Sequence, residues 1–391
     1  MNQQKFNGNR LKTARQYRGK SLSDLAKDVE VTKQAISQYE NGECTPDDKI
    51  FFRIINVLNF PWNYFYEKDD NNIETQTTYF RSLLKTYKKD RVAQTMKIEY
   101  LILLYEFLET YIDFPKLNIK NFSISEDEIN LNYIEEVSCE LRNYWKLDSN
   151  PIKDLIYELE KNGIILTSLE TTTNDIDAYS QKLKVENNSR FVVILSNNKN
   201  CKVRRHFDAA HELGHIVLHN FNEDMEAISK EDFTKMEKQA NLFAASFLLP
   251  KDAFLEDISF RPNSLEHYKN LKLKWNVSIM TMIMRAFSLS AITPNQYQYL
   301  MRQYSYKGWR KKEPYDNDLL VPEPTILRNA VEKIIGAGFM TGEQFISEFS
   351  NKYNLSLARD EIESLLNLEK NTLSDNKKEV VLEFKKEYKQ N

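Results

Sequence analysis

The stretch Val203-Arg-Arg-His-Phe-Asp-Ala-Ala-His-Glu-Leu-Gly-His-Ile-Val-Leu-His219 contains two histidines, His211 and His215, that are four residues apart. On a helix of about 3.6 residues per turn both imidazoles project from one face, so both can reach one metal ion. Glu212 then lies beside the ion without being a ligand, which suits a general base. The alternative is a core helix whose histidines are satisfied by hydrogen bonds. We interpret the stretch as a helix that binds zinc.

Catalytic zinc sites usually have three protein ligands and a water, so a third ligand is expected elsewhere. The segment 235–249 is amphipathic and predicts the next helix, on which Glu237 and Asn241 are one turn apart. Small residues nearby allow this helix to pack closely: Ala240, Ala244 and Ala245. Glu237 could complete a His-His-Glu site, and Asn241 could orient a ligating imidazole. Other acidic residues could compete with Glu237 but fall in a polar connection, where a solvated surface is more common: Glu223, Asp224, Glu226, Glu231 and Asp232.

The composition is that of a globular protein rich in helix. The chain has 391 residues, enough for two or three domains, with 41% hydrophobic residues, 28% charged residues and only 9 glycines. No apolar run approaches the roughly 20 residues that a membrane span needs, and no apolar signal core is present at the N-terminus. A cytoplasmic location without a membrane partner is therefore expected. Scattered cysteines predict neither a disulfide framework nor a thiolate metal site: Cys44, Cys139 and Cys201.

Charge is unevenly distributed along the chain. The net charge is −3, but residues 1–41 carry eight Lys or Arg against four acidic residues, a local charge of +4. This asymmetry favours a nucleic-acid contact, although a solvated surface would look the same. Ser21 can cap a helix over 22–29, and Thr32 can cap another over 33–40 that ends at Asn41-Gly42. With apolar helices before and after them, these two helices predict a helix-turn-helix.

Three segments carry a resemblance to the lambda-repressor-like, or XRE-type, helix-turn-helix family. They are Arg10-Leu-Lys-x-Ala-Arg15, Ser21-Leu-Ser-Asp-Leu-Ala26 and Val31-Thr-Lys-Gln-Ala-Ile-Ser-Gln-Tyr-Glu-Asn-Gly42. The resemblance implies that the protein binds a double-stranded DNA operator, and it allows a homodimer on paired half-sites. It also implies that four side chains face the major groove: Lys33, Gln34, Ser37 and Gln38. Asn41 and Ser21 are better placed for phosphates. The alternative is a protein-binding or dimerising helical domain.

The rest of the chain divides by pattern into further segments. A polar stretch after residue 66 reads as a linker, and two apolar stripes between 79 and 112 predict a helical arm that packs against a neighbour or a second copy of the chain. Amphipathic helices are expected over 129–145 and 151–162, the second stopped by Gly163. Short β-branched runs predict strands at 164–167 and 191–195, with a third at 177–180. Later helices are expected over 275–289, from Thr325 onward, and over 376–390.

A second resemblance covers about residues 130–330. The segments Arg205-x-Phe-Asp-Ala-Ala-His-Glu-Leu-Gly-His-x-x-Leu-His219 and Glu237-Lys-Gln-Ala-Asn-Leu-Phe-Ala-Ala-x-Phe-Leu-Leu-Pro250 are similar to the ImmA/IrrE family of zinc metallopeptidases. The resemblance implies that His211, His215 and Glu237 bind zinc and that Glu212 is the general base. His219 lies two turns beyond His211, so a supporting or packing role is favoured over ligation. Two further residues could stabilise the oxyanion, although structural roles are favoured for both: His206 and Tyr179.

The expected fold is multidomain and mostly α. It comprises an all-α helix-turn-helix domain at 1–68, a linker and helical arm at 69–125, an α+β zincin-like metallopeptidase domain with a small sheet at 126–290, and a mainly helical C-terminal region at 291–391. The resemblances together imply a DNA-binding regulatory zinc endopeptidase. Its substrate would be a repressor or antitoxin-like protein that controls a mobile element or a stress response.

Two alternatives to this function remain. In the first, the protein is a helix-turn-helix transcription regulator or antitoxin whose zinc site is structural or sensory. In the second, the helix-turn-helix is itself the substrate and is cut from the rest of the chain.

Overall fold

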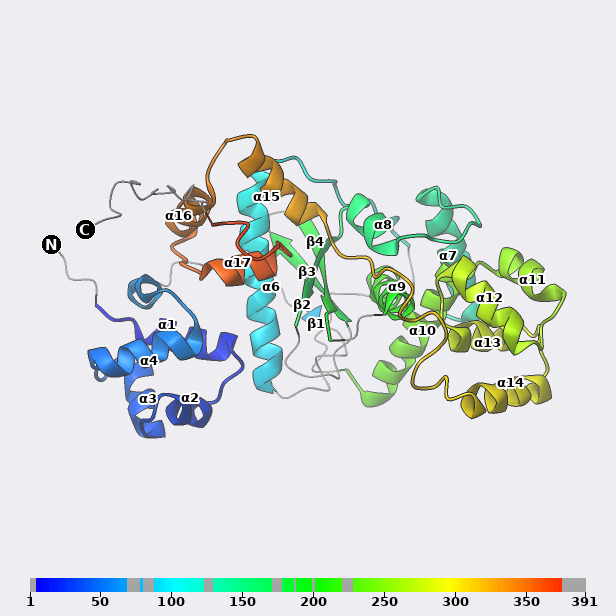
Figure 1. Cartoon of the computed structure of the whole chain (residues 1–391), viewed down its shortest axis with the longest axis horizontal. Coiled ribbons are helices and arrows are strands. Elements are labelled where there is room, and N and C mark those ends of the chain that lie inside the picture. The colour runs from blue at the N-terminus through cyan, green and yellow to red at the C-terminus, as the bar shows by residue number, and fades with distance from the viewer. Residues whose placement is uncertain are drawn as a thin grey trace, which may run out of the picture.

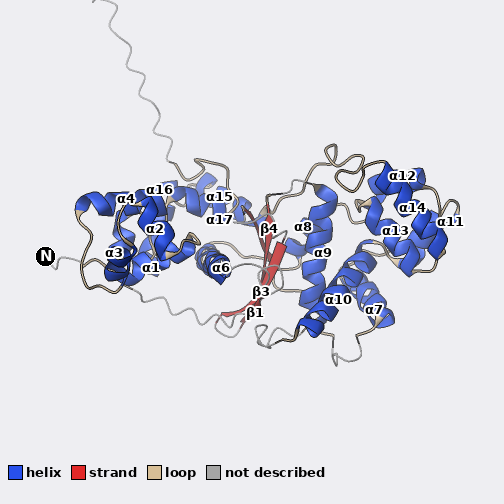
Figure 2. Cartoon of the chain, turned by 90° about the horizontal axis from the view of Figure 1, so that it is seen from below, coloured by secondary structure: helices blue, strands red, loops and turns tan. Residues whose placement is uncertain are grey.

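A computed structural model of the chain describes residues 5–68, 78–79, 88–122, 129–170, 178–185, 188–198, 201–219 and 228–374. The apolar stripe expected at Phe80 to Tyr87, the helix expected over 376–390, and three of the acidic residues considered as ligands lie outside this part: Glu223, Asp224 and Glu226. Within it, a small sheet stands between two helical cores (Figures 1 and 2). The structure therefore confirms the mostly α, multidomain fold class.

The N-terminal helices form the predicted helix-turn-helix. They are α1 (Gly8–Tyr17), α2 (Leu22–Asp28), α3 (Lys33–Glu40) and α4 (Asp48–Leu58), followed by the short 3-10 helix η1 (Trp62–Tyr66). Ser21 accepts a hydrogen bond from the backbone N–H of Asp24, and Thr32 accepts one from Ala35, as expected of N-caps. Gly42 has φ +72°, the left-handed conformation that ends α3.

The sheet has four strands in the order β1-β3-β4-β2. They are β1 (Thr78–Tyr79), β2 (Ile165–Leu169), β3 (Ala178–Val185) and β4 (Asn188–Ser196). β3 pairs antiparallel with β1 and β4, whereas β2 pairs parallel with β4. Side chains alternate along β4, so Ile194 enters one core and Val193 the other. The three predicted strands are confirmed, and the pairing of β1 is an addition to them.

One face of the sheet is covered by α6 (Lys88–Glu109) and by three helices from the C-terminal region. These are α15 (Ile326–Gly336), α16 (Gly342–Tyr353) and α17 (Arg359–Leu365). Figure 2 shows α6 on the side of the strands opposite α9 and α10. The buried apolar residues of α6 belong to the same core as the helix-turn-helix, so this chain itself covers the stripe that we expected to face a neighbour or a second copy.

The opposite face carries eight helices of the part that the structure describes. They are α7 (Leu131–Tyr144), α8 (Leu155–Lys161), α9 (Lys202–Leu218), α10 (Lys230–Leu248), α11 (Lys251–Ser259), α12 (Leu265–Trp275), α13 (Ile279–Ser288) and α14 (Pro294–Tyr306). α9 and α10 pack on each other, and α9 also contacts β3 and β4. No helix among the described residues is both long and apolar enough to cross a bilayer.

Three predicted helix boundaries were wrong, each because of a local capping group. The helix expected from Pro151 begins at Leu155, because Asp154 caps it. The helix expected from Trp275 begins at Ile279 with Ser278 as its cap, because Asn276 adopts φ 54° and ends the preceding helix at Trp275. α10 begins after Ser229 rather than at Lys235, so two acidic residues that we placed in a connection belong to its first turn: Glu231 and Asp232.

Hydrogen bonds connect the helix-turn-helix to the C-terminal helices. The hydroxyl of Tyr17 donates to Glu361 Oε1 at 2.5 Å, and Arg18 Nη1 donates to Oε2 of the same carboxylate at 2.6 Å. The ring of Tyr17 also stacks on that of Tyr100 in α6, with centroids 4.9 Å apart. The helix-turn-helix and α17 therefore share a buried polar contact that joins the two ends of the described chain.

Candidate metal centre

Close packing of α9 on α10 brings the predicted ligands together. A Cβ atom placed on Gly214 would lie 3.2 Å from the Cα of Ala240 and 3.0 Å from a ring carbon of Phe243. Any side chain at position 214 would therefore push the helices apart. This close approach places Glu237 of α10 opposite His211 and His215 of α9.

The three side chains form a compact set of ligand atoms. The two Nε2 atoms of His211 and His215 are 3.1 Å apart, and the Glu237 carboxylate lies 3.3 Å from His215 Nε2 and 3.7 Å from His211 Nε2. Ligand atoms about 2.1 Å from a tetrahedral zinc ion are roughly 3.3 Å from each other. Two imidazoles and one carboxylate at these separations fit the donor set of a zinc site.

A chain of hydrogen bonds fixes which nitrogen of His215 carries its proton. Gln239 donates its amide to the carbonyl of Ile129, so its Oε1 accepts from His219 Nε2 at 3.1 Å. Burial lowers the pKa of His219 to about 3, so this imidazole is neutral and its Nδ1 is an acceptor. His215 Nδ1, at 2.9 Å, must then donate to it. The lone pair of His215 Nε2 consequently faces Glu237, where a metal ion would bind.

His211 is oriented in the same way by a different partner. Its Nδ1 lies 3.1 Å from Oδ1 of Asn241, one turn beyond Glu237 on α10. If that oxygen accepts the Nδ1 proton, the Nε2 of His211 also presents a lone pair to the centre. Asn241 therefore occupies the position that we expected of a residue that orients a ligating imidazole.

Glu212 is buried beside the ligands and contacts the sheet. Its Oε2 accepts a hydrogen bond from the hydroxyl of Ser180 on β3 at 2.5 Å. Burial raises the pKa of the Glu212 carboxyl to about 8, and the nearby charges of Glu237 and Asp208 act in the same direction, whereas the Ser180 hydrogen bonds oppose the shift. A divalent cation at the centre would lower this pKa again. The carboxyl can thus exchange a proton near neutral pH.

The structure does not bring the two oxyanion candidates to the centre. The hydroxyl of Tyr179 donates to Gln94 of α6 at 2.8 Å, on the sheet face opposite α9. His206 is fully buried, neither of its ring nitrogens has a hydrogen-bond partner among the residues that the structure describes, and burial lowers its pKa to about 3. Both positions match the structural roles that the sequence favoured.

The predicted DNA-contacting residues lie on or beside α3. Lys33 and Gln34 are exposed, whereas Ser37 and Gln38 are half-buried. Asn41 is exposed, and its amide donates to the Glu43 carboxylate at 3.3 Å. Ser21 is half-buried and uses its oxygen as the N-cap of α2. Figure 1 shows α2 and α3 at the end of the molecule remote from α9 and α10.

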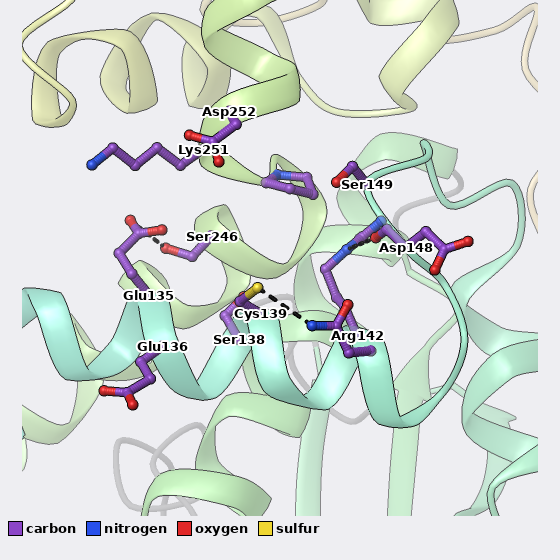
Figure 3. A pocket seen from close by; sticks show the side chains of 12 residues that line it. Glu135, Glu136, Ser138, Cys139, Arg142, Asp148, Ser149, Ser246, Lys251 and Asp252 are labelled. Atoms are coloured by element: carbon purple, nitrogen blue, oxygen red, sulfur yellow. Dashed lines mark hydrogen bonds between the residues drawn. The ribbon is translucent and has the colours of Figure 1, made fainter.

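Two hollows are lined by none of the three ligand residues. One, of about 260 Å³, separates α7 from the start of α11 and is shown in Figure 3. Its Glu135 is paired with Arg285 and Ser246, and its Arg142 donates to three backbone carbonyls. The other, of about 460 Å³, lies along the N-terminal half of α9 and includes Asp208, one turn before His211. This second hollow is the one that adjoins the metal centre along the helix.

Sequence reasoning missed two residues of the site. Gln239 lies on the helix that supplies the third ligand, Glu237. A polar residue next to the small residue Ala240, on the side expected to pack against another helix, was the available signal for it. Ser180 lies on a predicted strand, but its contact with Glu212 depends on how β3 sits on α9, which the sequence does not encode locally. Both residues act on groups that the sequence had already identified.

Comparisons with known proteins agree with this arrangement. The family described as the IrrE N-terminal-like domain, peptidase M78, matches residues 160–287, which include α9 and most of the helices around it. The family described as helix-turn-helix matches residues 11–65. No curated protein matches the chain. The chain therefore carries an XRE-type helix-turn-helix domain followed by an IrrE/ImmA-like peptidase M78 domain, in the order that the sequence predicts.

Proposed function

We propose that the protein is a DNA-binding regulatory zinc endopeptidase that hydrolyses a peptide bond in a repressor or antitoxin-like partner. The observation that carries the proposal is the convergence of His211, His215 and Glu237 on one point, with the buried carboxyl of Glu212 beside them. The match to the metallopeptidase family and the helix-turn-helix at the other end of the chain support it. The regulatory role would control a mobile element or a stress response.

In this proposal His211, His215 and Glu237 hold zinc, and their own partners prepare them for it. When bound, the zinc ion supplies a Lewis acid that polarises the scissile carbonyl and lowers the pKa of a water molecule to about 7. Glu212 takes the proton of the attacking water on its carboxylate and returns it to the leaving amine. Ser180 holds one oxygen of that carboxylate, which restricts its rotation and fixes the position of the other oxygen.

The helix-turn-helix supplies the DNA-binding part of the proposal. Lys33 and Gln34 are exposed at the start of α3, where the recognition helix of this motif contacts base edges. A Gln34→Ala and Gln38→Ala double substitution should abolish operator-specific binding and leave zinc content unchanged. Selection of bound sequences from random duplex DNA measures this, and an unaltered preference in the variant would remove these residues from the proposal.

The peptidase part is tested with Glu212→Gln. This variant should retain zinc, because Glu212 is not a ligand, and should no longer cut a repressor or antitoxin-like protein that the wild type cuts. Glu237→Gln should lose zinc as well as activity. Cleavage by the Glu212→Gln protein at the wild-type rate, or wild-type protein that contains no zinc, would contradict the proposal.

Burial of two of the three ligands supports a second candidate function, in which zinc is structural or sensory, whereas the third ligand, His211, is partly exposed. His215 is 2% exposed and Glu237 is 6% exposed, and structural zinc sites are typically closed whereas catalytic ones keep an open position. A regulator or antitoxin of this kind would keep all regulation in the Glu212→Gln variant and lose it in the Gln34→Ala and Gln38→Ala variant. Reporter expression in cells that carry each variant distinguishes the two functions.

In a further alternative the helix-turn-helix is itself the substrate, and the pairing of β1 with β3 supports this alternative. β1 lies between the helix-turn-helix and the rest of the chain, and it pairs with β3 at Gln181 and Lys182, next to Ser180. β1 therefore lies beside the strand that contacts Glu212. Incubation of the purified zinc protein alone, followed by mass spectrometry, would show self-cleavage as an N-terminal fragment of helix-turn-helix size.

A further inference from the structure

The hollow of about 460 Å³ beside the metal centre lies on the same stripe of α9 as the histidines. Arg204, Asp208, His211 and His215 follow one another at spacings of four, three and four residues, which places them along one face of the helix. Arg204 and Asp208 line the hollow. At 1.5 Å per residue, Arg204 lies about 10 Å before His211, which an extended peptide covers in roughly three residues.

Cationic side chains dominate the rim of this hollow. Arg204, Arg310, Lys311 and Lys312 all line it, and all are exposed. Two of its three acidic residues, Glu313 and Asp316, share the buried ammonium group of Lys272 at 2.8 and 2.5 Å. The lining has four cationic and three acidic residues, and the buried Lys272 offsets charge of Glu313 and Asp316, so the hollow favours an anionic ligand.

The loop that carries three of these cations is anchored by the core. The carboxylate of Glu313 accepts hydrogen bonds from the backbone N–H groups of Ile279 and Met280, at the start of α13, and from the hydroxyl of Tyr304. Trp309 packs edge-on against Tyr304, with ring centroids 6.1 Å apart. Because Trp309 and Glu313 are held on either side of it, the backbone of the Arg310-Lys311-Lys312 run is preorganised at the rim.

We propose that this hollow is a substrate subsite that binds an acidic side chain of the peptide about two to three residues from the scissile bond. The inference rests on the proposed peptidase function and adds its substrate class, a peptide segment with Asp or Glu at that position. A peptide fits better than a nucleic acid, because the hollow continues the helix of the metal centre, whereas α3 lies at the remote end of the molecule (Figure 1). Arg204 and Lys312 would contact the acidic group directly.

The test measures peptide binding separately from cleavage. The probes are fluorescein-labelled ten-residue peptides of alternating Glu and Ala, and the same peptides with Gln in place of Glu. Fluorescence polarisation with the zinc-loaded Glu212→Gln protein gives affinity without turnover. The test variant is Arg204→Ser with Lys312→Ser. The matched control is Arg302→Ser with Lys333→Ser, which removes two exposed cations that do not line the hollow.

The Glu peptide should bind more tightly than the Gln peptide, and increasingly so as salt is lowered from 200 to 50 mM. The Arg204 and Lys312 substitutions should weaken the Glu peptide about three- to tenfold, the range of two exposed charge contacts, and the control less than twofold. Equal affinity for both peptides, no binding of the Glu peptide, or an equal loss in the control would overturn the inference. The inference would also be overturned if an unrelated oligonucleotide displaced the peptide from a protein that additionally carries Gln34→Ala and Gln38→Ala.

Failure of the proposed function gives a different result. If the wild-type zinc protein cuts no repressor and no peptide, but the Glu peptide still binds through Arg204 and Lys312, the hollow is an acidic-peptide site on a protein that is not a peptidase. If cleavage occurs without any preference for acidic residues in the products of a mixed peptide library, the peptidase function stands and the subsite is wrong.

Discussion

Replacing Gln239 with Leu should weaken zinc binding without touching a ligand. In the wild-type protein Gln239 Oε1 accepts a hydrogen bond from His219 Nε2. Nδ1 of His219 is therefore left to accept a hydrogen bond from His215 Nδ1. Leu removes the acceptor, and a buried N–H without a partner costs about 1–3 kcal/mol. His219 can avoid that cost by moving its proton to Nδ1, which then faces the Nδ1 proton of His215 at 2.9 Å. His215 would have to protonate Nε2 and could no longer ligate.

The expected loss is about 10- to 100-fold in zinc affinity, or roughly 1.4–2.7 kcal/mol, the range for partners that orient a ligating histidine. Competition between the metal-free protein and a chromogenic chelator at pH 7.5 measures it. Lys238→Leu is the matched control, because it places the same side chain on the exposed face of α10, and it should bind zinc as tightly as the wild type. A folded Gln239→Leu protein with affinity within twofold of the wild type would refute the tautomer argument.

Three further substitutions test other parts of the structure. Gly214→Ala should lower the free energy of unfolding by about 1–3 kcal/mol in urea denaturation and weaken zinc binding, because the added Cβ meets α10. Gly336→Ala is the control, since its Cβ would meet open space and should not destabilise the fold. Equal effects of the two substitutions would contradict the packing argument. Burial lowers the pKa of His206 to about 3, so its contribution to stability is complete above pH 6.5 and is lost as the pH falls. About 2 kcal/mol should disappear between pH 7.5 and 5, and His206→Leu should remove that part of the slope and leave the part due to His219, whose pKa burial also lowers to about 3. An unchanged slope would assign the acid sensitivity to other groups. Glu361→Gln should speed hydrogen exchange in α1, because Tyr17 and Arg18 lose a charged acceptor, while Glu332→Gln, at an exposed position of α15, should not. Protection of α1 at the wild-type level would show that this contact does not hold the helix-turn-helix.

Features that depend on neighbouring residues could be predicted from the sequence. Ser21 and Thr32 cap their helices because each hydroxyl bonds a backbone N–H three residues on, within one turn. The pairing of His211 with His215 follows from the helical period alone. Glu237 was harder, since it comes from a second helix, but the small residues around it indicated a close helix contact.

Features that depend on packing between distant segments could not be predicted. The Tyr17 hydroxyl meets Glu361, which is 344 residues away, and no local pattern marks that pair. Ser180 contacts Glu212 only because β3 packs against α9 with Ser180 beside Glu212. The same limit applies to α6, whose apolar stripe indicated a partner but not that the partner is the C-terminal end of the same chain.

The most direct test of the account combines zinc content and cleavage in one set of samples. Zinc is measured by elemental analysis in the wild-type, Glu212→Gln and Glu237→Gln proteins, and the same samples are incubated with a panel of candidate repressor and antitoxin-like proteins. The account predicts one zinc per chain and cleavage in the wild type, zinc without cleavage in Glu212→Gln, and neither in Glu237→Gln. Full zinc in Glu237→Gln, or wild-type cleavage in Glu212→Gln, would contradict it.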